Sequence, residues 1–197
     1  MVIGVIPARL QSTRFPNKIL TPINEKPMVM HVYDRAREAE KLDDVIIAID
    51  STETEEALKQ YKPNIKMTHP DHLSGTDRVA EAVKDMDVEV ILNIQGDEPM
   101  LDPSIIDQLV CCFDDELVEM ATIGSRVIDN SDYFNPNSVK MMINENGFAT
   151  SFSREIKDYQ IGAYYHHVGI YGYRKDTLLR FTMLDQSTNE KSLNLEQ

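Results

Sequence analysis

Short apolar runs that alternate with helical segments dominate the first half of the chain. Residues 2–6, 45–49 and 89–94 read Val-Ile-Gly-Val-Ile, Val-Ile-Ile-Ala-Ile and Glu-Val-Ile-Leu-Asn-Ile. Runs of this length and composition are typical of strands that are buried on both faces of a parallel sheet. Between them the sequence predicts helices over about 27–40, 52–60 and 76–86, and another helix beginning at Pro103. We therefore expect an α/β fold, a mostly parallel central sheet with helices on both faces.

The second half of the chain has a different pattern. Residues 120–128, 138–143, 148–152 and 168–173 alternate or run as strands, and the Asn-Glu-Asn-Gly segment at 144–147 predicts a hairpin turn. We expect this half to be mixed, with at least one antiparallel hairpin. A chain of 197 residues loses about 70% of its surface on folding. Since it also contains no repeat, low-complexity tract or linker, we expect a single domain over residues 1–197.

The charge of the chain narrows its possible partners. Lys and Arg number 20 and Asp and Glu 33, so the formal net charge is −13. Because such a surface repels polyanions, we expect neither nucleic acid nor an acidic membrane as the main partner. No apolar run approaches the ~18 residues of a membrane span. The two cysteines, Cys111 and Cys112, are adjacent, a spacing that rarely gives an unstrained disulfide, and a reducing cytoplasmic setting follows.

A basic segment directly after the first apolar run is an exception to this acidic composition. It carries Arg9, Arg14 and Lys18, with Ser12 among them. Open α/β sheets bind ligands beyond the carboxyl ends of their strands, and Arg, Lys and hydroxyl groups can hold phosphate oxygens there. The segment contains no glycine and so matches neither common nucleotide-binding fingerprint. The alternative interpretation is three solvated surface cations.

One acidic residue follows the 89–94 run at the same predicted edge of the sheet. The chain continues there as Gln95-Gly96-Asp97-Glu98-Pro99. A carboxylate at this place could hold Mg²⁺, which prefers one or two carboxylates together with phosphate oxygens and water. The alternative is that Asp97 only caps an ordinary turn.

Five segments of the chain occur in the order and spacing found in one enzyme family. They are Pro-Ala-Arg-Leu-Gln-Ser-Thr-Arg-Phe-Pro-Asn-Lys at 7–18, Asn-Glu-Lys-Pro-Met at 24–28, Ser-Gly-Thr-Asp-Arg at 74–78, Gln-Gly-Asp-Glu-Pro at 95–99 and Val-Gly-Ile-Tyr-Gly-Tyr-Arg at 168–174. In these segments the chain resembles the 3-deoxy-manno-octulosonate (KDO) cytidylyltransferases, the CMP-KDO synthetases. The resemblance covers essentially the whole chain. It implies the Rossmann-like fold of the nucleotide-diphospho-sugar transferases.

The resemblance also implies a reaction and a set of site residues. CMP would pass from CTP to KDO, with release of pyrophosphate, for lipopolysaccharide synthesis; Mg²⁺ would be the cofactor, and two chains would pair as a homodimer. The implied catalytic residues are Arg9, Lys18 and Asp97, and Asp97 is the implied metal ligand. The implied nucleotide-binding residues are Arg9, Ser12, Arg14, Lys18, Ser74, Gly75 and Arg78. The implied sugar-binding residues are Gln95, Arg154, His167, Tyr171, Glu196 and Gln197.

The chain departs from the family pattern at two places. Asn17 stands where the family usually has glycine, and asparagine is the next most tolerant residue of left-handed backbone. Family members also continue beyond the point where this sequence stops, Gln197, with a stretch Gly-Val-Asp-Thr-x-Glu-Asp-Leu whose first Asp is a second metal carboxylate. The resemblance is therefore to a member that is short at its C-terminus.

Three alternatives stay open beside CMP transfer to KDO. The first is a cytidylyltransferase for a related acidic sugar such as 8-amino-KDO. The second is a glycosyltransferase, although such enzymes usually carry Asp-x-Asp at the metal site and residues 95–98 do not. The third is a nucleotide-binding member without catalysis, an interpretation that the missing second carboxylate favours.

Overall fold

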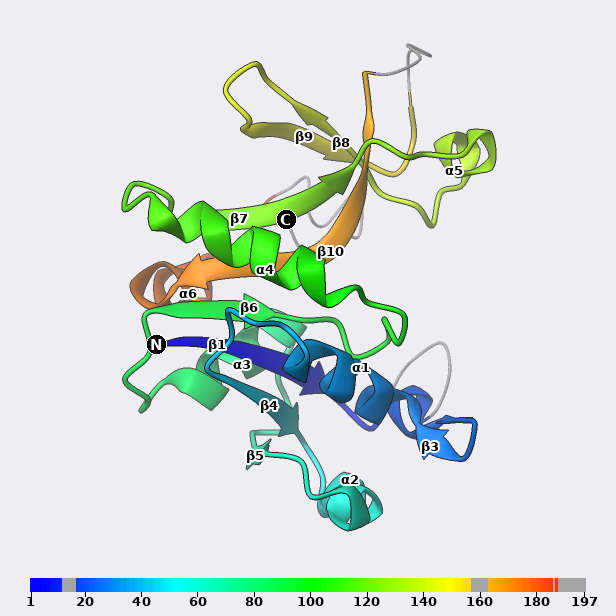
Figure 1. Ribbon diagram of the computed structural model, residues 1–197, viewed down its shortest axis with the longest axis vertical. Coiled ribbons are helices and arrows are strands. Elements are labelled where there is room, and N and C mark those ends of the chain that lie inside the picture. The colour runs from blue at the N-terminus through cyan, green and yellow to red at the C-terminus, as the bar shows by residue number, and fades with distance from the viewer. Residues whose placement is uncertain (12–16, 157–162, 186, 188–197) are drawn as a thin grey trace. The chain divides into compact units, whose positions relative to one another are not determined.

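The computed structural model describes residues 1–11, 17–156, 163–185 and 187 (Figure 1). The chain divides into two compact units. The first unit contains residues 1–121 and 170–184, and the second contains residues 122–169 together with those from Asp185 onward. That the whole chain folds as the single domain expected from its length stays a prediction.

The first unit is built on a parallel sheet. Its strands are β1 (Val2–Ala8), β4 (Asp44–Ile49), β5 (Ile65–Met67) and β6 (Val90–Asn93), in the spatial order β5-β4-β1-β6. Neighbouring strands are parallel, with Ala8 opposite Ile49 and Val5 opposite Asn93. The last residues of β10 (Tyr165–Arg174) pair with β6 in the antiparallel direction, from Tyr171 onward. The parallel sheet expected from the apolar runs is confirmed.

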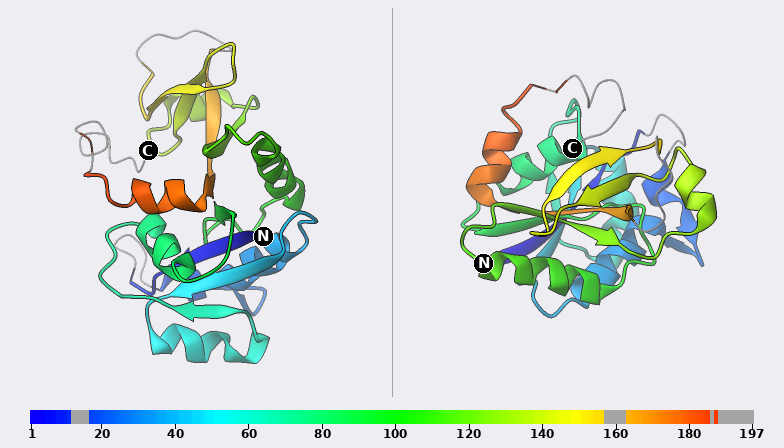
Figure 2. Two further views of the ribbon diagram at one scale, coloured as in Figure 1. Left: turned by 90° about the vertical axis from the view of Figure 1, so that its left-hand side faces the viewer. Right: turned by 90° about the horizontal axis from the view of Figure 1, so that it is seen from above.

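Helices cover both faces of this sheet (Figures 1 and 2). The helix α1 (Met28–Arg37) contacts α4 (Pro103–Cys111), and α3 (Gly75–Val83) contacts α6 (Lys175–Phe181) on the other face. A further helix, α2 (Thr52–Leu58), follows β4. The core against α3 is formed by alternate residues of the strands together with apolar residues of the helices: Ile3, Val5, Ile46, Ala48, Val79, Ala80, Ala82, Val83, Val88, Ile91, Tyr171, Tyr173 and Leu178.

Polar residues at the helix starts explain where the chain turns from strand to helix. The Ser51 side chain accepts a hydrogen bond from the Thr54 N–H and begins α2. Ser74 and Asp77 form a capping box at the start of α3. Asp102 accepts from the Ser104 N–H, with Pro103 in the first turn of α4. Among the described residues no helix has both the length and the apolar composition needed to cross a membrane.

The second unit consists mainly of antiparallel strands. β8 (Lys140–Ile143) and β9 (Ala149–Ser153) form the hairpin that the sequence predicts, and Gly147, with φ of 84°, lies in its turn. The first residues of β10 pair with β8. β7 (Met120–Ser125) pairs with β10, and the short α5 (Asn130–Phe134) leads toward β8. The mixed second half of the fold is thereby confirmed.

Candidate functional site

Charged residues of the first unit gather just beyond the carboxyl ends of its parallel strands. Arg9 follows β1, Asp50 follows β4, and Asp97 lies a few residues after β6. Because these strands are parallel neighbours, their carboxyl ends lie at one edge of the sheet. Arg9 and Asp97 therefore lie at a common edge of the sheet, as we expect from the sequence.

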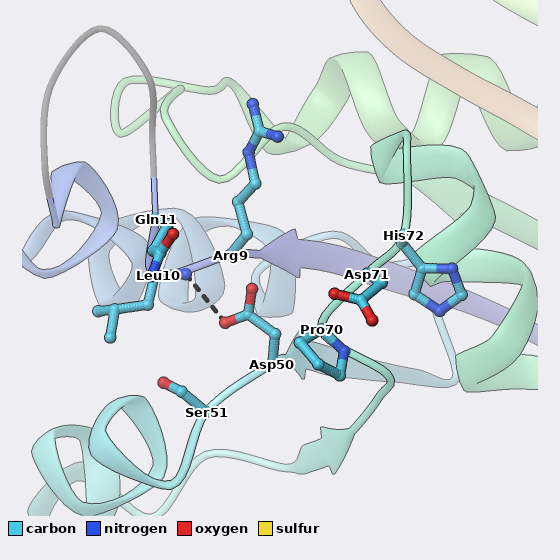
Figure 3. A pocket seen from close by; sticks show the side chains of 8 residues that line it. All are labelled: Arg9, Leu10, Gln11, Asp50, Ser51, Pro70, Asp71 and His72. Carbon is cyan, nitrogen blue, oxygen red and sulfur yellow. Dashed lines mark hydrogen bonds between the residues drawn. The ribbon is translucent and has the colours of Figure 1, made fainter.

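A pocket of about 470 Å³ lies at this edge (Figure 3). The segment after β1, the turn after β4 and the loop before α3 contribute its lining: Arg9, Leu10, Gln11, Asp50, Ser51, Pro70, Asp71 and His72. Arg9 is exposed. A cavity of this size, with cationic, anionic and amide side chains, is suited to a small polar ligand.

Lys18 and Asp97 form an ion pair although they lie 79 positions apart. The Nζ of Lys18 donates to Oδ2 of Asp97, and the two side chains are 43% and 40% exposed. Asn17, with φ of 55°, has the left-handed backbone expected of a residue that replaces glycine, and it turns the chain into the short helical segment Lys18–Leu20.

Gly96 allows the chain beyond β6 to approach β1 closely. A Cβ atom at Gly96 would lie 3.3 Å from the carbonyl oxygen of Pro7 and 3.4 Å from Cγ2 of Ile6. A larger residue would push this segment away from β1, and Asp97 follows directly in the chain. The glycine therefore helps to hold the Asp97 carboxylate beside Lys18.

A buried arginine connects several segments at the same edge. Arg78 of α3 is 2% exposed, and its guanidinium donates to Thr68 Oγ1 at 2.6 Å, His69 O at 3.2 Å and Asp50 Oδ2 at 3.3 Å. Burial lowers the pKa of Arg78, with the Arg9 charge adding to the effect and Asp50 and Glu81 opposing it. Direct contact between Arg78 and a nucleotide stays a prediction, since these three oxygens already accept from its guanidinium.

The start of α3 packs against the end of β1. A Cβ atom at Gly75 would lie 3.3 Å from Cγ of Pro7. The Ser74 hydroxyl accepts from the Asp77 N–H at 3.1 Å and donates to Asp77 Oδ2 at 2.8 Å. Ser74 and Gly75, two predicted nucleotide-binding residues, therefore lie at the edge that carries Arg9.

The predicted sugar-binding residues are divided between the two units. In the first unit, Gln95 is half-buried directly after β6, and Tyr171 is buried in β10 opposite Asn93. In the second unit, Arg154 follows β9 and donates from Nη1 to the carbonyl oxygen of Pro136 at 3.1 Å. His167 lies in β10. That these four residues line one pocket stays a prediction.

His167 is a buried, neutral histidine. It is 6% exposed, its Nε2 lies 3.0 Å from Oγ1 of Thr122, and its ring meets that of Phe152 edge-on at 5.0 Å between centroids. Burial lowers its pKa to about 4, and the neighbouring His166 acts in the same direction. The imidazole is therefore uncharged at neutral pH and serves as a hydrogen-bonding group rather than as a cation.

Four predicted site residues, Ser12, Arg14, Glu196 and Gln197, lie outside the described residues. Asp50 also lines the pocket at this edge and is not among the site residues that the sequence predicts. The capping group of α2 is Ser51. The sequence did contain a signal for Asp50: it is an acidic residue directly after a buried strand, and the next residue, Ser51, can cap the following helix instead.

The donor set at the sheet edge fits a magnesium ion that is shared with phosphate oxygens. Within residues 1–11, 17–156, 163–185 and 187, no group of three His, Cys, Asp or Glu side chains is arranged to hold a metal. The exposed carboxylate of Asp97 provides one hard oxygen ligand. Mg²⁺ keeps several waters and commonly uses one or two carboxylates plus substrate phosphates, so a single carboxylate is sufficient to begin such a site.

A Rossmann-like parallel sheet with cations and an exposed carboxylate beyond its carboxyl edge is the arrangement of a nucleotide-binding transferase. Residues 3–197 match the family model described as "Cytidylyltransferase". The chain belongs to this cytidylyltransferase family, the one that the five sequence segments predict. A family member is a nucleotidyltransferase, so the enzyme class is confirmed too.

Individual relatives are similar over the whole chain. A 3-deoxy-manno-octulosonate cytidylyltransferase of Solibacter usitatus (strain Ellin6076) is 43% identical over 202 residues, which cover 100% of this chain and 80% of the relative. An 8-amino-3,8-dideoxy-manno-octulosonate cytidylyltransferase of Shewanella sp. (strain W3-18-1) is 38% identical over 208 residues, with 100% and 84% covered.

Solved structures agree with the fold described above. The structure of a CMP:2-keto-3-deoxy-manno-octonic acid synthetase complexed with CTP superimposes with a TM-score of 0.92 at 36% identity, covering 99% of this chain and 83% of that one. A 4-diphosphocytidyl-2C-methyl-D-erythritol synthase from Anaerococcus prevotii DSM 20548 gives a TM-score of 0.61 at 13% identity, a likeness of fold alone. The expected nucleotide-diphospho-sugar transferase fold is confirmed.

Proposed function

We propose that this protein transfers CMP from CTP to 3-deoxy-manno-octulosonate and releases pyrophosphate, a reaction of lipopolysaccharide synthesis. The observation that carries the proposal is the Lys18–Asp97 pair, at the sheet edge that presents Arg9, in a chain that is 36% identical to a synthetase complexed with CTP. Relatives with 43% and 39% identity are named for the same activity.

The proposed reaction mainly requires that the two substrates are positioned and that the charge of the triphosphate is neutralised. A hydroxyl oxygen of the sugar forms a bond to the α-phosphorus of CTP, the bond to the pyrophosphate oxygen breaks, and the hydroxyl proton is released. Arg9 offers a planar fork and Lys18 a compact ammonium for the phosphate oxygens. Groups fixed before the substrate arrives stabilise developing charge without reorganising during the reaction.

Asp97 is the residue that would hold Mg²⁺. When bound, the ion would polarise a phosphoryl oxygen and offset the charge of the leaving pyrophosphate. Asp97 also pairs with the Lys18 ammonium, which supports a place for this cation close to the proposed metal ion and phosphates. We propose that Lys18 then donates to phosphate oxygens while Asp97 keeps it at the edge of the sheet.

The sugar substrate carries a carboxylate, and Arg154 of the second unit is the cation that we assign to it. Arg154 has a guanidinium, the side chain best suited to bidentate binding of a carboxylate, and the Pro136 carbonyl orients it. His167, neutral and hydrogen-bonded to Thr122, would present an uncharged group to sugar hydroxyls. Gln95 and Tyr171 complete the proposed sugar-binding set.

A second candidate substrate is the 8-amino analogue of KDO, because a relative with 38% identity is named for it. The deciding experiment measures pyrophosphate release from CTP and Mg²⁺ with KDO or with 8-amino-KDO. We expect kcat/KM to be higher for KDO, and no pyrophosphate without sugar or in the presence of EDTA. A higher kcat/KM for 8-amino-KDO would replace the proposed sugar. Binding of CTP with no pyrophosphate from either sugar would favour a nucleotide-binding protein without catalysis.

We also propose that the protein works in the cytoplasm as a homodimer. The two free cysteines, both exposed, fit a reducing compartment. Sedimentation equilibrium tests the assembly, with twice the chain mass of 22.5 kDa as the expected result.

A further inference from the structure

We propose that Asp50 is a positioning residue of the nucleotide site, whose carboxylate holds the backbone after β1 to Arg78 of α3. The inference rests on the proposed binding of CTP and assigns to that site a residue that would not touch the nucleotide. Asp50 itself is nearly buried, with 11% of its side chain exposed.

One oxygen of Asp50 fixes the segment that carries Arg9. Its Oδ1 accepts from the backbone N–H of Leu10 at 2.9 Å (Figure 3). The bond joins the residues just beyond two neighbouring strands, since Ala8 of β1 lies opposite Ile49 of β4. Because Arg9 precedes Leu10 directly, this bond restricts the backbone from which the Arg9 side chain extends.

The other oxygen fixes the helix on the opposite wall. Oδ2 of Asp50 accepts from Nη2 of Arg78 at 3.3 Å, and Nη1 of Arg78 donates to Thr68 Oγ1 and His69 O. Thr68 in turn donates from its hydroxyl to the carbonyl oxygen of Ile49 at 2.7 Å. One carboxylate thus connects the segment after β1 with α3 and with the loop after β5, three parts of the site edge.

The charges at this edge favour positioning over direct contact. A carboxylate repels a triphosphate, so Asp50 is unsuited to be a phosphate ligand itself. Arg78 and Arg9 are cations close enough that the charge of Arg9 lowers the pKa of Arg78, and the Asp50 charge opposes that effect. Asp50 therefore offsets the buried charge of Arg78 and leaves the exposed Arg9 available to an anion.

Two substitutions at Asp50 separate its two contacts. Asp50→Asn keeps an oxygen that can accept from Leu10 but removes the charge beside Arg78, and Asp50→Ala removes both. Asp43→Asn is the matched control, because Oδ2 of Asp43 accepts from the Val2 N–H at 2.7 Å at the opposite end of β1. Thermal unfolding of all three variants shows which of them remain folded.

The binding of CTP and of CMP, measured by titration calorimetry, tests the role. If Asp50 positions the phosphate-binding segment, Asp50→Ala should raise the Kd of CTP about tenfold or more, the effect of losing a hydrogen bond to a charged group, while the Kd of CMP changes less. Asp50→Asn should lie between wild type and Asp50→Ala, and Asp43→Asn should match wild type. Equal losses for CMP and CTP would overturn the inference, since they would mean that Asp50 contacts the nucleoside. Unchanged Kd values would overturn it as well.

Amide hydrogen exchange at Leu10 gives a second measurement that does not depend on the nucleotide. The Leu10 N–H should exchange slowly in wild type and in Asp50→Asn, and fast in Asp50→Ala. Fast exchange in folded wild-type protein would overturn the inference. If the Leu10 N–H is protected as expected but wild type binds no CTP, the proposed function fails although the hydrogen bond between Asp50 and Leu10 is confirmed.

Discussion

Lys18 at the start of a short helical segment pairs with Asp97 beyond β6, 79 positions further along the chain. In the proposed reaction Lys18 binds the phosphate oxygens and Asp97 holds the metal ion. The ion pair therefore joins two groups of the same proposed site.

Removal of the Asp97 charge should reduce turnover far more than it reduces folding stability. Asp97→Asn keeps the size of the side chain but removes the carboxylate proposed to hold Mg²⁺. We expect kcat to fall about 100-fold or more, the usual cost of losing one fixed electrostatic group at a reacting centre. Pyrophosphate release at saturating CTP measures the effect. The control is Asp85→Asn, at an exposed residue in the turn after α3, which should retain wild-type kcat.

Removal of the Lys18 ammonium should act on nucleotide binding. In Lys18→Met the phosphate oxygens lose a charged donor, and we expect the KM for CTP to rise about tenfold or more. Initial rates over a range of CTP concentrations measure it. Lys59→Met changes an exposed lysine that directly follows α2 and pairs with Glu56, and it should leave the KM unchanged. A KM for CTP equal to wild type in Lys18→Met would contradict the proposed role.

Acid should destabilise the protein partly through His167. The folded pKa of about 4 lies below the ordinary value of 6.5, so in this interval the unfolded chain binds a proton that the folded chain does not. Stability therefore falls as the pH falls from 6.5 to 4. At about 1.4 kcal/mol for each pH unit, wild type should lose about 3 kcal/mol more than His167→Gln over this range. Urea unfolding followed by circular dichroism at several pH values measures the difference.

The control for this prediction is His69→Asn, at a histidine whose side chain is 66% exposed. Its pH dependence should follow that of wild type. A His167→Gln protein as sensitive to acid as wild type would show that the buried imidazole is not the group responsible.

Lys140 should matter to the stability of the second unit. Its ammonium is buried, with 1% of the residue exposed, and donates to the carbonyl oxygens of Asn135, Ser138 and Arg154 at 2.6 to 2.9 Å. Burial lowers the pKa of this lysine, and the Asp132 charge opposes the shift. Lys140→Met removes a charged donor from three carbonyls, which should lower the free energy of unfolding by about 3 kcal/mol or more.

Urea unfolding again provides the measurement for Lys140→Met. Lys59→Met, on the exposed surface of the first unit, should cost close to nothing because lysine and methionine have similar helix propensities. A loss in Lys140→Met no greater than in Lys59→Met would mean that water replaces the ammonium at these carbonyls.

The sheet of the first unit could be predicted because its signals are local. A strand buried on both faces must be apolar at every position, and the runs at 2–6 and 45–49 are. The start of α3 could be predicted because Ser74 and Asp77 satisfy backbone groups within one turn. The parallel order then places Arg9 and Asp97 at one edge without any knowledge of their contacts.

The remaining features depend on partners that are distant in the chain. β10 extends over Tyr165–Arg174, beyond the predicted 168–173, because its first residues pair with β8 and its last with β6. A lysine in a strand, such as Lys140, gives no sign that carbonyls of three other residues will surround it. The place of Asp50 between Leu10 and Arg78 likewise depends on two elements at once.

The capping box of α3 has a consequence for how this sheet edge can attract an anion. Helix starts often bind phosphate through free N–H groups and the positive end of the helix dipole. Here Ser74 and Asp77 occupy that place, and Asp77 brings a negative charge to it. Attraction is then left to solvent-facing side-chain cations such as Arg9 and Lys18, which dissolved ions screen within about 10 Å at 0.1 M salt. The Kd of a nucleotide should therefore rise with ionic strength more steeply than it would at a site built from backbone amides.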